Sequence, residues 1–273
     1  MNKAAMAIGV FDSGMGGMTV LRALKAALPH ESFIYLGDTA RLPYGTKSPE
    51  TVQQYAVQMA RVLVERRIKA LVIACNTATT AALPHLQNVL PDIPVLGVVA
   101  PGARAAVAST QNQRIAVLAT ETTIAANAYQ DLIQHYLPRA QLYARACSVL
   151  VALAEEGMVD NAIAEAAIHH YLSGLQEEDT VLLGCTHFPV FKPLIMRLYP
   201  HLRLVDSAEA IANELKQTLN DTQLLASNRS AAPRVQYLVT DSVKRFHKVG
   251  ELFLGHALDL NAIELIDIRP IKH

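Results

Sequence analysis

The sequence has no tryptophan, only three cysteines and no excess of charge of either sign. Its 24 basic residues match 24 acidic ones, so we expect no electrostatic footprint for nucleic acid or for an anionic membrane surface. Three is an odd number of cysteines and too few for a disulfide-rich scaffold, which indicates a reducing compartment. These absences argue against a nucleic-acid-binding protein and against a secreted fold held by disulfides.

Long apolar runs are also missing. No run approaches the length of a membrane span, and the first residues lead into an expected strand without a cleavable apolar segment. We therefore expect a cytoplasmic protein without membrane attachment. A hydrophobic content of 51% and a mean hydropathy of +0.21 predict a compact interior, and 273 residues suffice for one large or two ordinary domains.

Short apolar runs alternate with helical patterns along the chain. Strands are expected at residues 5–11, 32–36, 70–74, 94–99, 114–118, 141–145, 180–183, 203–205 and 234–239. Helices are expected at residues 19–27, 48–66, 100–108, 123–135, 161–172 and 208–219. Strands that alternate with helices predict an α/β protein with parallel sheets and right-handed crossovers.

Two pairs of segments repeat at nearly the same spacing. The segment Ile8-Gly-Val-Phe-Asp-Ser has the same pattern as Ile115-Ala-Val-Leu-Ala-Thr, which begins 107 positions later. Cys75 and Cys185 each end an apolar run and are 110 positions apart. This repetition predicts two similar parallel-sheet lobes related by a pseudo-two-fold axis, with the active site in the cleft between them. The expected lobes are residues 1–98 with 207–273, and residues 99–206.

The two repeated cysteines stand in the same local setting. Asn76-Thr77 follows the first thiol and Thr186-His187 follows the second, where a core strand would continue with apolar residues. Open α/β sheets bind ligands outside the carboxyl ends of their strands, so we expect both thiols to face one substrate. Two thiols on opposite sides of a carbon could remove a proton from one face and return one to the other.

The partners of the two thiols differ. His187 lies two residues beyond Cys185 and could favour its thiolate form, whereas Cys147 has no polar setting and is expected to be an inert core residue. Cys75, Cys185, His187 and Asp12 are also types of metal ligand. Since no C-x-x-C or H-x-x-x-H clustering supports a metal centre, we expect none.

Two glycine-containing loops follow expected strands. Residues 11–17 place Asp12 and Ser13 before three glycines, where the carboxylate is expected to point into the ligand crevice. The glycine spacing is not G-x-G-x-x-G, so a dinucleotide site is weakly supported and an ordinary strand-to-helix turn remains the alternative. Residues 36–45 end in Tyr44-Gly45, which would offer a phenol and an open amide to a carboxylate unless the loop is a simple connector.

Four motifs together resemble those of the glutamate racemases, within the aspartate/glutamate racemase family. They are Phe-Asp12-Ser13-Gly-x-Gly-Gly, Gly37-Asp38-Thr39-x-x-x-Pro43-Tyr44-Gly45, Ala74-Cys75-Asn76-Thr77-Ala-Thr and Leu183-Gly184-Cys185-Thr186-His187-Phe-Pro189. The resemblance implies the two-lobed racemase fold and a cofactor-independent proton transfer that interconverts L- and D-glutamate, the D form serving peptidoglycan. It also implies that the small-molecule partner is glutamate. We expect the protein to be a homodimer.

The resemblance implies a role for each matching residue. The catalytic residues would be Cys75, acting on D-glutamate, and Cys185, acting on L-glutamate, assisted by Asp12 and His187. The substrate contacts would be Asp12, Ser13, Tyr44, Gly45, Asn76, Thr77, Thr120, Thr186 and His187.

The sequence also departs from the family at two places. Ala119 stands where the family often has glycine before the threonine that corresponds to Thr120. The N-terminal extension of members that a peptidoglycan precursor activates is absent from the sequence given, so we do not expect that regulation. An aspartate racemase of the same family, a dithiol redox enzyme and a non-catalytic amino-acid sensor remain alternatives.

Overall fold

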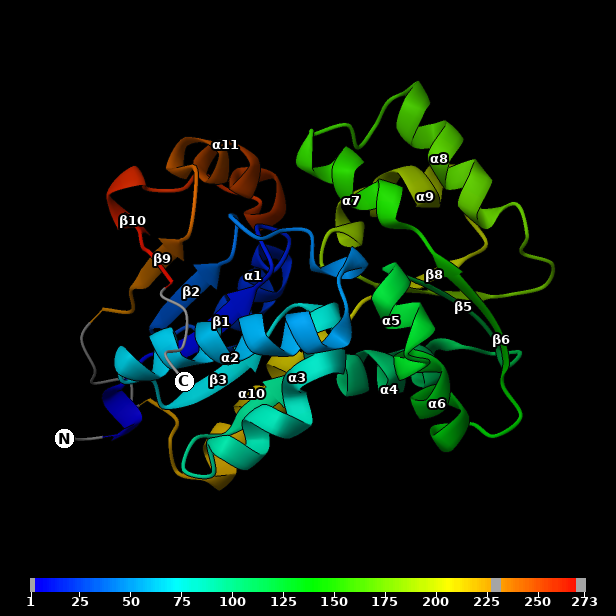
Figure 1. The fold of residues 1–273 in the computed structure, drawn as a ribbon. Helices are drawn as coiled ribbons and strands as arrows, with labels where there is room; N and C mark the ends of the chain where they lie inside the picture. Colours follow the sequence, from blue (N-terminus) through cyan, green and yellow to red (C-terminus); the bar gives the residue numbers. More distant parts are fainter. Residues whose placement is uncertain (1–2, 227–231, 269–273) are drawn as a thin grey trace.

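The structure is a computed structural model that describes residues 3–226 and 232–268. Over these ranges it contains two parallel sheets, each flanked by helices, which form two lobes (Figure 1). One sheet has the strand order β10-β9-β2-β1-β3-β4 and the other β6-β5-β7-β8. The first sheet contains β1 Ile8–Asp12, β2 Phe33–Gly37, β3 Ala70–Ile73, β4 Val95–Gly97, β9 Val235–Val239 and β10 Ile263–Leu265. The second contains β5 Arg114–Ala119, β6 Gln141–Ala146, β7 Thr180–Gly184 and β8 Arg203–Val205.

Helices connect successive strands, as parallel pairing requires. In the first part of the chain they are α1 Met18–Ala27, α2 Pro49–Glu65, α3 Asn76–Val89 and α4 Val99–Ser109. They continue with α5 Glu121–Ala125, α6 Ala128–Tyr136, α7 Ser148–Glu155, α8 Ala162–Leu172, α9 Lys192–Leu198, α10 Ala208–Asp221 and α11 Val243–Leu254. Short 3-10 turns are η1 Lys3–Ala5, η2 Tyr44–Thr46, η3 Phe188–Phe191 and η4 Leu260–Ala262. None of these helices is long and apolar enough to cross a membrane, in the part of the chain that the structure describes.

The two sheets repeat one another strand for strand. The order β2-β1-β3-β4 in the first lobe matches β6-β5-β7-β8 in the second. In register, Phe11 pairs with Ile73 just as Leu118 pairs with Leu183. Cys75 and Cys185 each come two residues after the second member of these pairs, so equivalent strands deliver them to equivalent places. The prediction of an α/β protein with two similar parallel-sheet lobes is confirmed.

Both ends of the described chain contribute to the first lobe. After β8 the chain returns through α10, which contacts α1 and α4; β9 then pairs with β2, and β10 forms the edge of the sheet beside β9. Figure 1 accordingly shows the blue and orange-to-red segments in one lobe and the green segments in the other. The lobe boundaries at residues 98/99 and 206/207 stay a prediction.

Several elements differ from the expected ones. The first strand begins at Ile8, because Lys3–Ala5 forms a 3-10 turn, and the helix expected at 123–135 is interrupted where Asn127 takes a left-handed φ of 51°. Four helices (α3, α7, α9 and α11) and strand β10 were not expected. Helix α3 was missed because its polar first turn resembles a loop and because it contains Pro84.

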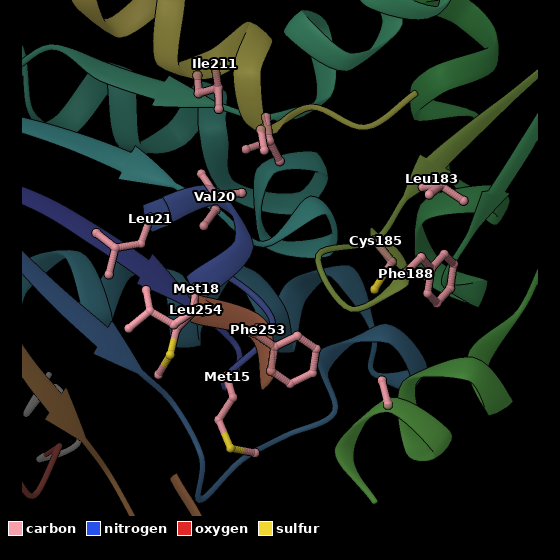
Figure 2. Close-up of a cluster of buried hydrophobic side chains, with 14 of the residues drawn as sticks. Met15, Met18, Val20, Leu21, Leu183, Cys185, Phe188, Ile211, Phe253 and Leu254 are labelled. Carbon is pink, nitrogen blue, oxygen red and sulfur yellow. The ribbon is translucent and has the colours of Figure 1, made fainter. Parts of the chain in front are cut away.

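One hydrophobic cluster extends through both lobes and includes Cys185. Figure 2 shows Met15 and Met18 from the first lobe near Phe253 of α11, with Leu183, Cys185 and Phe188 in the second lobe. Nearly all these side chains are fully buried. The lobes therefore share a core, and Cys185 is at once a member of this core and a residue of the cavity described next.

Candidate active site

A small cavity lies where the carboxyl ends of the two sheets meet. The predicted site residues that line it are Ser13, Tyr44, Gly45, Cys75, Asn76, Thr77, Thr120, Cys185, Thr186 and His187. Its volume of about 20 Å³ has room for about one water molecule, so a dicarboxylic amino acid can enter only if the lining elements separate. A wider hollow of about 930 Å³ between α1, α4 and α10 is lined by no thiol or imidazole and offers no comparable chemistry.

Cys75 occupies the N-cap position of α3. Its sulfur accepts a hydrogen bond from the Ala78 amide at 3.4 Å and lies 3.6 Å from Ser13 Oγ. Burial raises the pKa of Cys75 to about 12, and the negative charge of Asp12 adds to this effect. Cys75 therefore carries its proton at neutral pH, although the helix N-terminus alone would favour a thiolate.

Asp12 stands behind the cavity and connects the two lobes. It is fully buried, accepts a hydrogen bond from the Gly14 amide at 3.0 Å, and accepts a second from Thr186 Oγ1 of the other lobe at 3.3 Å. Burial raises the pKa of Asp12 above 3.8, although the positive charge of His187 opposes the shift. The carboxylate thus acts on the cavity through Thr186 and through its charge.

Cys185 has a different partner, the imidazole of His187. The sulfur lies 3.8 Å from His187 Nδ1, and His187 Nε2 lies 3.0 Å from Glu155 Oε1. Burial by itself lowers the pKa of His187, but the hydrogen bonds with Cys185 and Glu155 outweigh it and raise the pKa to about 10. At neutral pH the imidazole is therefore a cation beside the sulfur of Cys185.

The two half-sites are therefore unequal in charge. One thiol is kept protonated by burial beside a carboxylate, and the other faces an imidazolium. One thiol and one thiolate is the state that a two-base proton transfer needs at the start of each turnover.

The loop that carries Tyr44 and Gly45 covers the cavity. The Tyr44 hydroxyl donates to the buried carboxylate of Asp38, which also accepts from Arg41 Nε at 2.6 Å and Thr240 Oγ1 at 3.0 Å. The phenol is thus engaged with the protein, and Tyr44 contributes its ring and backbone to the cavity wall.

Threonines of the second lobe meet this loop and the start of α3. Thr77 Oγ1 lies 2.9 Å from Thr120 Oγ1, and the Thr122 hydroxyl donates to the Gly45 carbonyl at 2.9 Å. A Cβ on Gly45 would lie 2.6 Å from Thr120 Cβ, so only glycine permits this approach. These contacts hold the covering loop of one lobe against the other lobe.

The structure brings together ten of the eleven predicted site residues around one cavity, with Asp12 one hydrogen bond behind it. Sequence reasoning missed Glu155 and Tyr129, whose hydroxyl donates to Asn76 Oδ1 at 2.5 Å. Glu155 ends a helix that was not predicted and is 32 positions from His187, so no local pattern signals it. Asp38 lies within one of the four motifs, but the sequence predicted no role for it. No group of three or more potential metal ligands is found among residues 3–226 and 232–268.

Comparison with known proteins identifies the family of the chain. The family model described as Asp/Glu/Hydantoin racemase matches residues 15–215. A glutamate racemase from Geobacter metallireducens is 48% identical over 255 residues, which cover 92% of this chain and 94% of that protein.

Solved structures give the same result. A glutamate racemase isoform from Bacillus anthracis superposes with a TM-score of 0.90 at 37% identity, over 98% of this chain and 99% of that one. The Francisella tularensis glutamate racemase, solved in complex with D-glutamate, has a TM-score of 0.89 at 35% identity over 97% and 98% of the two chains. The chain therefore belongs to the Asp/Glu/hydantoin racemase family and, within it, to the glutamate racemases.

Proposed function

We propose that this protein interconverts L- and D-glutamate by proton transfer between two cysteines, without a cofactor. The observation that carries the proposal is the pair Cys75 and Cys185, which end equivalent strands of the two lobes and line the same closed cavity. Glutamate is the substrate named for a relative that is 48% identical to this chain over 255 residues.

Starting from L-glutamate, Cys185 is the base. Its thiolate takes the α-proton, so that an S–H bond forms as the C–H bond breaks, and the electron pair passes to the α-carbon and its carboxylate. The Cys75 thiol then gives its proton to the opposite face of that carbon and is left as a thiolate. Starting from D-glutamate, the two cysteines exchange roles.

The protein environment must stabilise the carbanion, because a C–H bond beside a carboxylate is only weakly acidic. Hydroxyl and amide groups of Ser13, Asn76, Thr77 and Thr186 line the cavity and can donate to the two carboxylates of the substrate. Donors held in place before the reaction stabilise developing negative charge most effectively where water is excluded. The small cavity provides such a site once it closes over the substrate.

His187 and Asp12 have supporting roles. The imidazolium, held by Glu155, faces the Cys185 sulfur and offsets part of the negative charge that the substrate carboxylates bring into the cavity. Asp12 compensates part of this positive charge from behind Thr186. We further expect D-glutamate to enter peptidoglycan, and the enzyme to act in the cytoplasm as a homodimer.

The decisive experiment replaces each thiol separately. Cys75→Ala and Cys185→Ala should both abolish racemisation. Racemisation is measured by circular dichroism of glutamate and by uptake of deuterium at the α-carbon in heavy water. Cys147→Ala is the matched control, because Cys147 is equally buried but absent from the cavity lining. Native-rate racemisation by either single variant would contradict the two-thiol mechanism.

The racemisation assay, together with measurements of disulfide formation and of glutamate binding, separates the three alternative functions. An aspartate racemase would racemise aspartate faster than glutamate. A dithiol redox enzyme would form a reversible disulfide and exchange no α-hydrogen. A sensor would bind glutamate equally well after both thiols are removed.

A further inference from the structure

Tyr129 is a buried residue that contacts both the segment carrying Cys185 and the segment carrying Cys75. It lies at the start of α6 and is fully buried. A Cβ on Gly184, the residue before Cys185, would lie 2.8 Å from Tyr129 Cε2, and a Cβ on Gly102 would lie 3.2 Å from Tyr129 Cε1. Both glycines therefore make room for the ring, and the ring is fixed against the segment that carries Cys185.

The hydroxyl of Tyr129 reaches the other cysteine segment. It donates to Oδ1 of Asn76 at 2.5 Å, and Asn76 directly follows Cys75. Asn76 is 3% exposed and lines the cavity. A carboxamide offers one acceptor oxygen and one NH₂ donor group. Because the oxygen is engaged by Tyr129, the NH₂ group is the part left for the cavity.

The opposite orientation of the amide is unfavourable. If the amide were turned, the Tyr129 hydroxyl would accept from the NH₂ group, and its own proton would need another acceptor. In the described part of the chain the Tyr129 hydroxyl has only Asn76 as a hydrogen-bond partner, and a buried donor without an acceptor is costly. Burial also raises the pKa of Tyr129, so the phenol keeps the proton that it donates.

We infer that Tyr129 is a positioning residue that fixes Asn76 with its NH₂ group toward the cavity, and so makes Asn76 a ligand for a carboxylate of the substrate and not for its ammonium group. The inference rests on the proposed function, since it assigns Asn76 to one part of an amino-acid substrate. Tyr129 does not itself line the cavity and acts through Asn76.

A double-mutant cycle tests the inference. Tyr129→Phe keeps the ring and removes one oxygen; we expect it to lower kcat/KM for glutamate about five- to tenfold, the worth of one buried hydrogen bond. In an Asn76→Ala background the same change should lower kcat/KM less than about twofold, because the group that Tyr129 positions is gone. Equal losses in both backgrounds, or no loss in either, would overturn the inference.

Two further variants separate positioning from a general structural effect. Tyr171→Phe, which alters another buried tyrosine of the second lobe that does not line the cavity, should leave kcat/KM unchanged. Asn76→Asp should bind D-glutamate more weakly than Asn76→Ala in calorimetry, because it presents an oxygen anion to the substrate carboxylate. Tighter binding by the aspartate variant would instead indicate a contact with the ammonium group and would refute the assignment.

Amide orientation can also be read without substrate. In NMR spectra of the native protein, the Asn76 side-chain NH₂ protons should show no strong nuclear Overhauser effect to the Tyr129 ring protons. A strong effect would refute the inference even if glutamate is racemised. If the native protein fails to racemise glutamate, the proposed function fails, and this measurement still tests the orientation on its own.

Discussion

Replacing Glu155 by glutamine should lower the pKa of His187 from about 10 to about 8 or 9. The Glu155 carboxylate lies 3.0 Å from His187 Nε2, and its side chain is only 8% exposed, so water screens the interaction little. A hydrogen bond to a charged group is worth about 1.5 to 3 kcal/mol, and one pKa unit corresponds to about 1.36 kcal/mol. Glutamine keeps the shape and an acceptor oxygen but removes the charge.

The kinetic consequence follows from the loss of the imidazolium. The basic limb of the pH profile of kcat/KM should move to lower pH by about one to two units, because His187 loses its proton earlier. L- and D-glutamate have equal free energy in water, so kcat/KM must fall by the same factor in both directions. The asymmetry should appear in the isotope effect, which should grow for α-deuterated L-glutamate, whose hydrogen Cys185 removes.

Glu156→Gln is the matched control for this prediction. Glu156 is the next residue, its side chain is 61% exposed, and it pairs with Arg245 at the surface. NMR titration of the His187 imidazole should show the lowered pKa in Glu155→Gln alone. An unchanged pKa in that variant, or an equal drop in Glu156→Gln, would refute the reasoning.

Three further predictions concern stability and closure. Asp12→Asn should abolish most activity, yet its melting temperature at pH 8 should be no lower than that of the native protein. Burial raises the pKa of Asp12, so its ionised form costs stability as pH rises above 3.8. A lower melting temperature of the variant at pH 8 would contradict this prediction. His187 has a pKa of about 10 in the folded protein against 6.5 when exposed, so the stability it contributes is present below pH 6.5 and is lost as pH rises through 10. In denaturant unfolding, the free energy of unfolding of His187→Asn should therefore decline less steeply than that of the native protein over this range. Gly45→Ala should raise KM about tenfold, because the new Cβ would lie 2.6 Å from Thr120 Cβ and push the covering loop away from it. The control Gly157→Ala, whose new Cβ would have no atom within 4 Å, should reduce only the melting temperature.

The sequence alone pointed to the candidate site because its signals are local. Each strand that leads to Cys75 or Cys185 is an apolar run ended by a small residue and polar groups, and strand ends of parallel sheets meet at one edge. The repeat spacing predicted two lobes of the same order, and the strand pairing of Phe11 with Ile73 and of Leu118 with Leu183 confirms it.

Helices were harder to predict than strands. Helix α3 begins with polar residues whose side chains can hydrogen-bond the backbone in a turn as well as in a helix. Only the structure, in which Cys75 caps the first turn, shows that a helix forms. The break at Asn127 likewise depends on how α5 and α6 pack, and an amphipathic pattern continues across it.

Only the tertiary structure decided how the two thiols differ. The sequence placed His187 beside Cys185, but the raised pKa of the imidazole also depends on Glu155, which ends α7 of the second lobe. It placed Asn76 beside Cys75, but the orientation of that amide depends on Tyr129, which comes from the other lobe. Charge and amide orientation are set by burial and by partners distant in the chain, and no local pattern in the sequence encodes either.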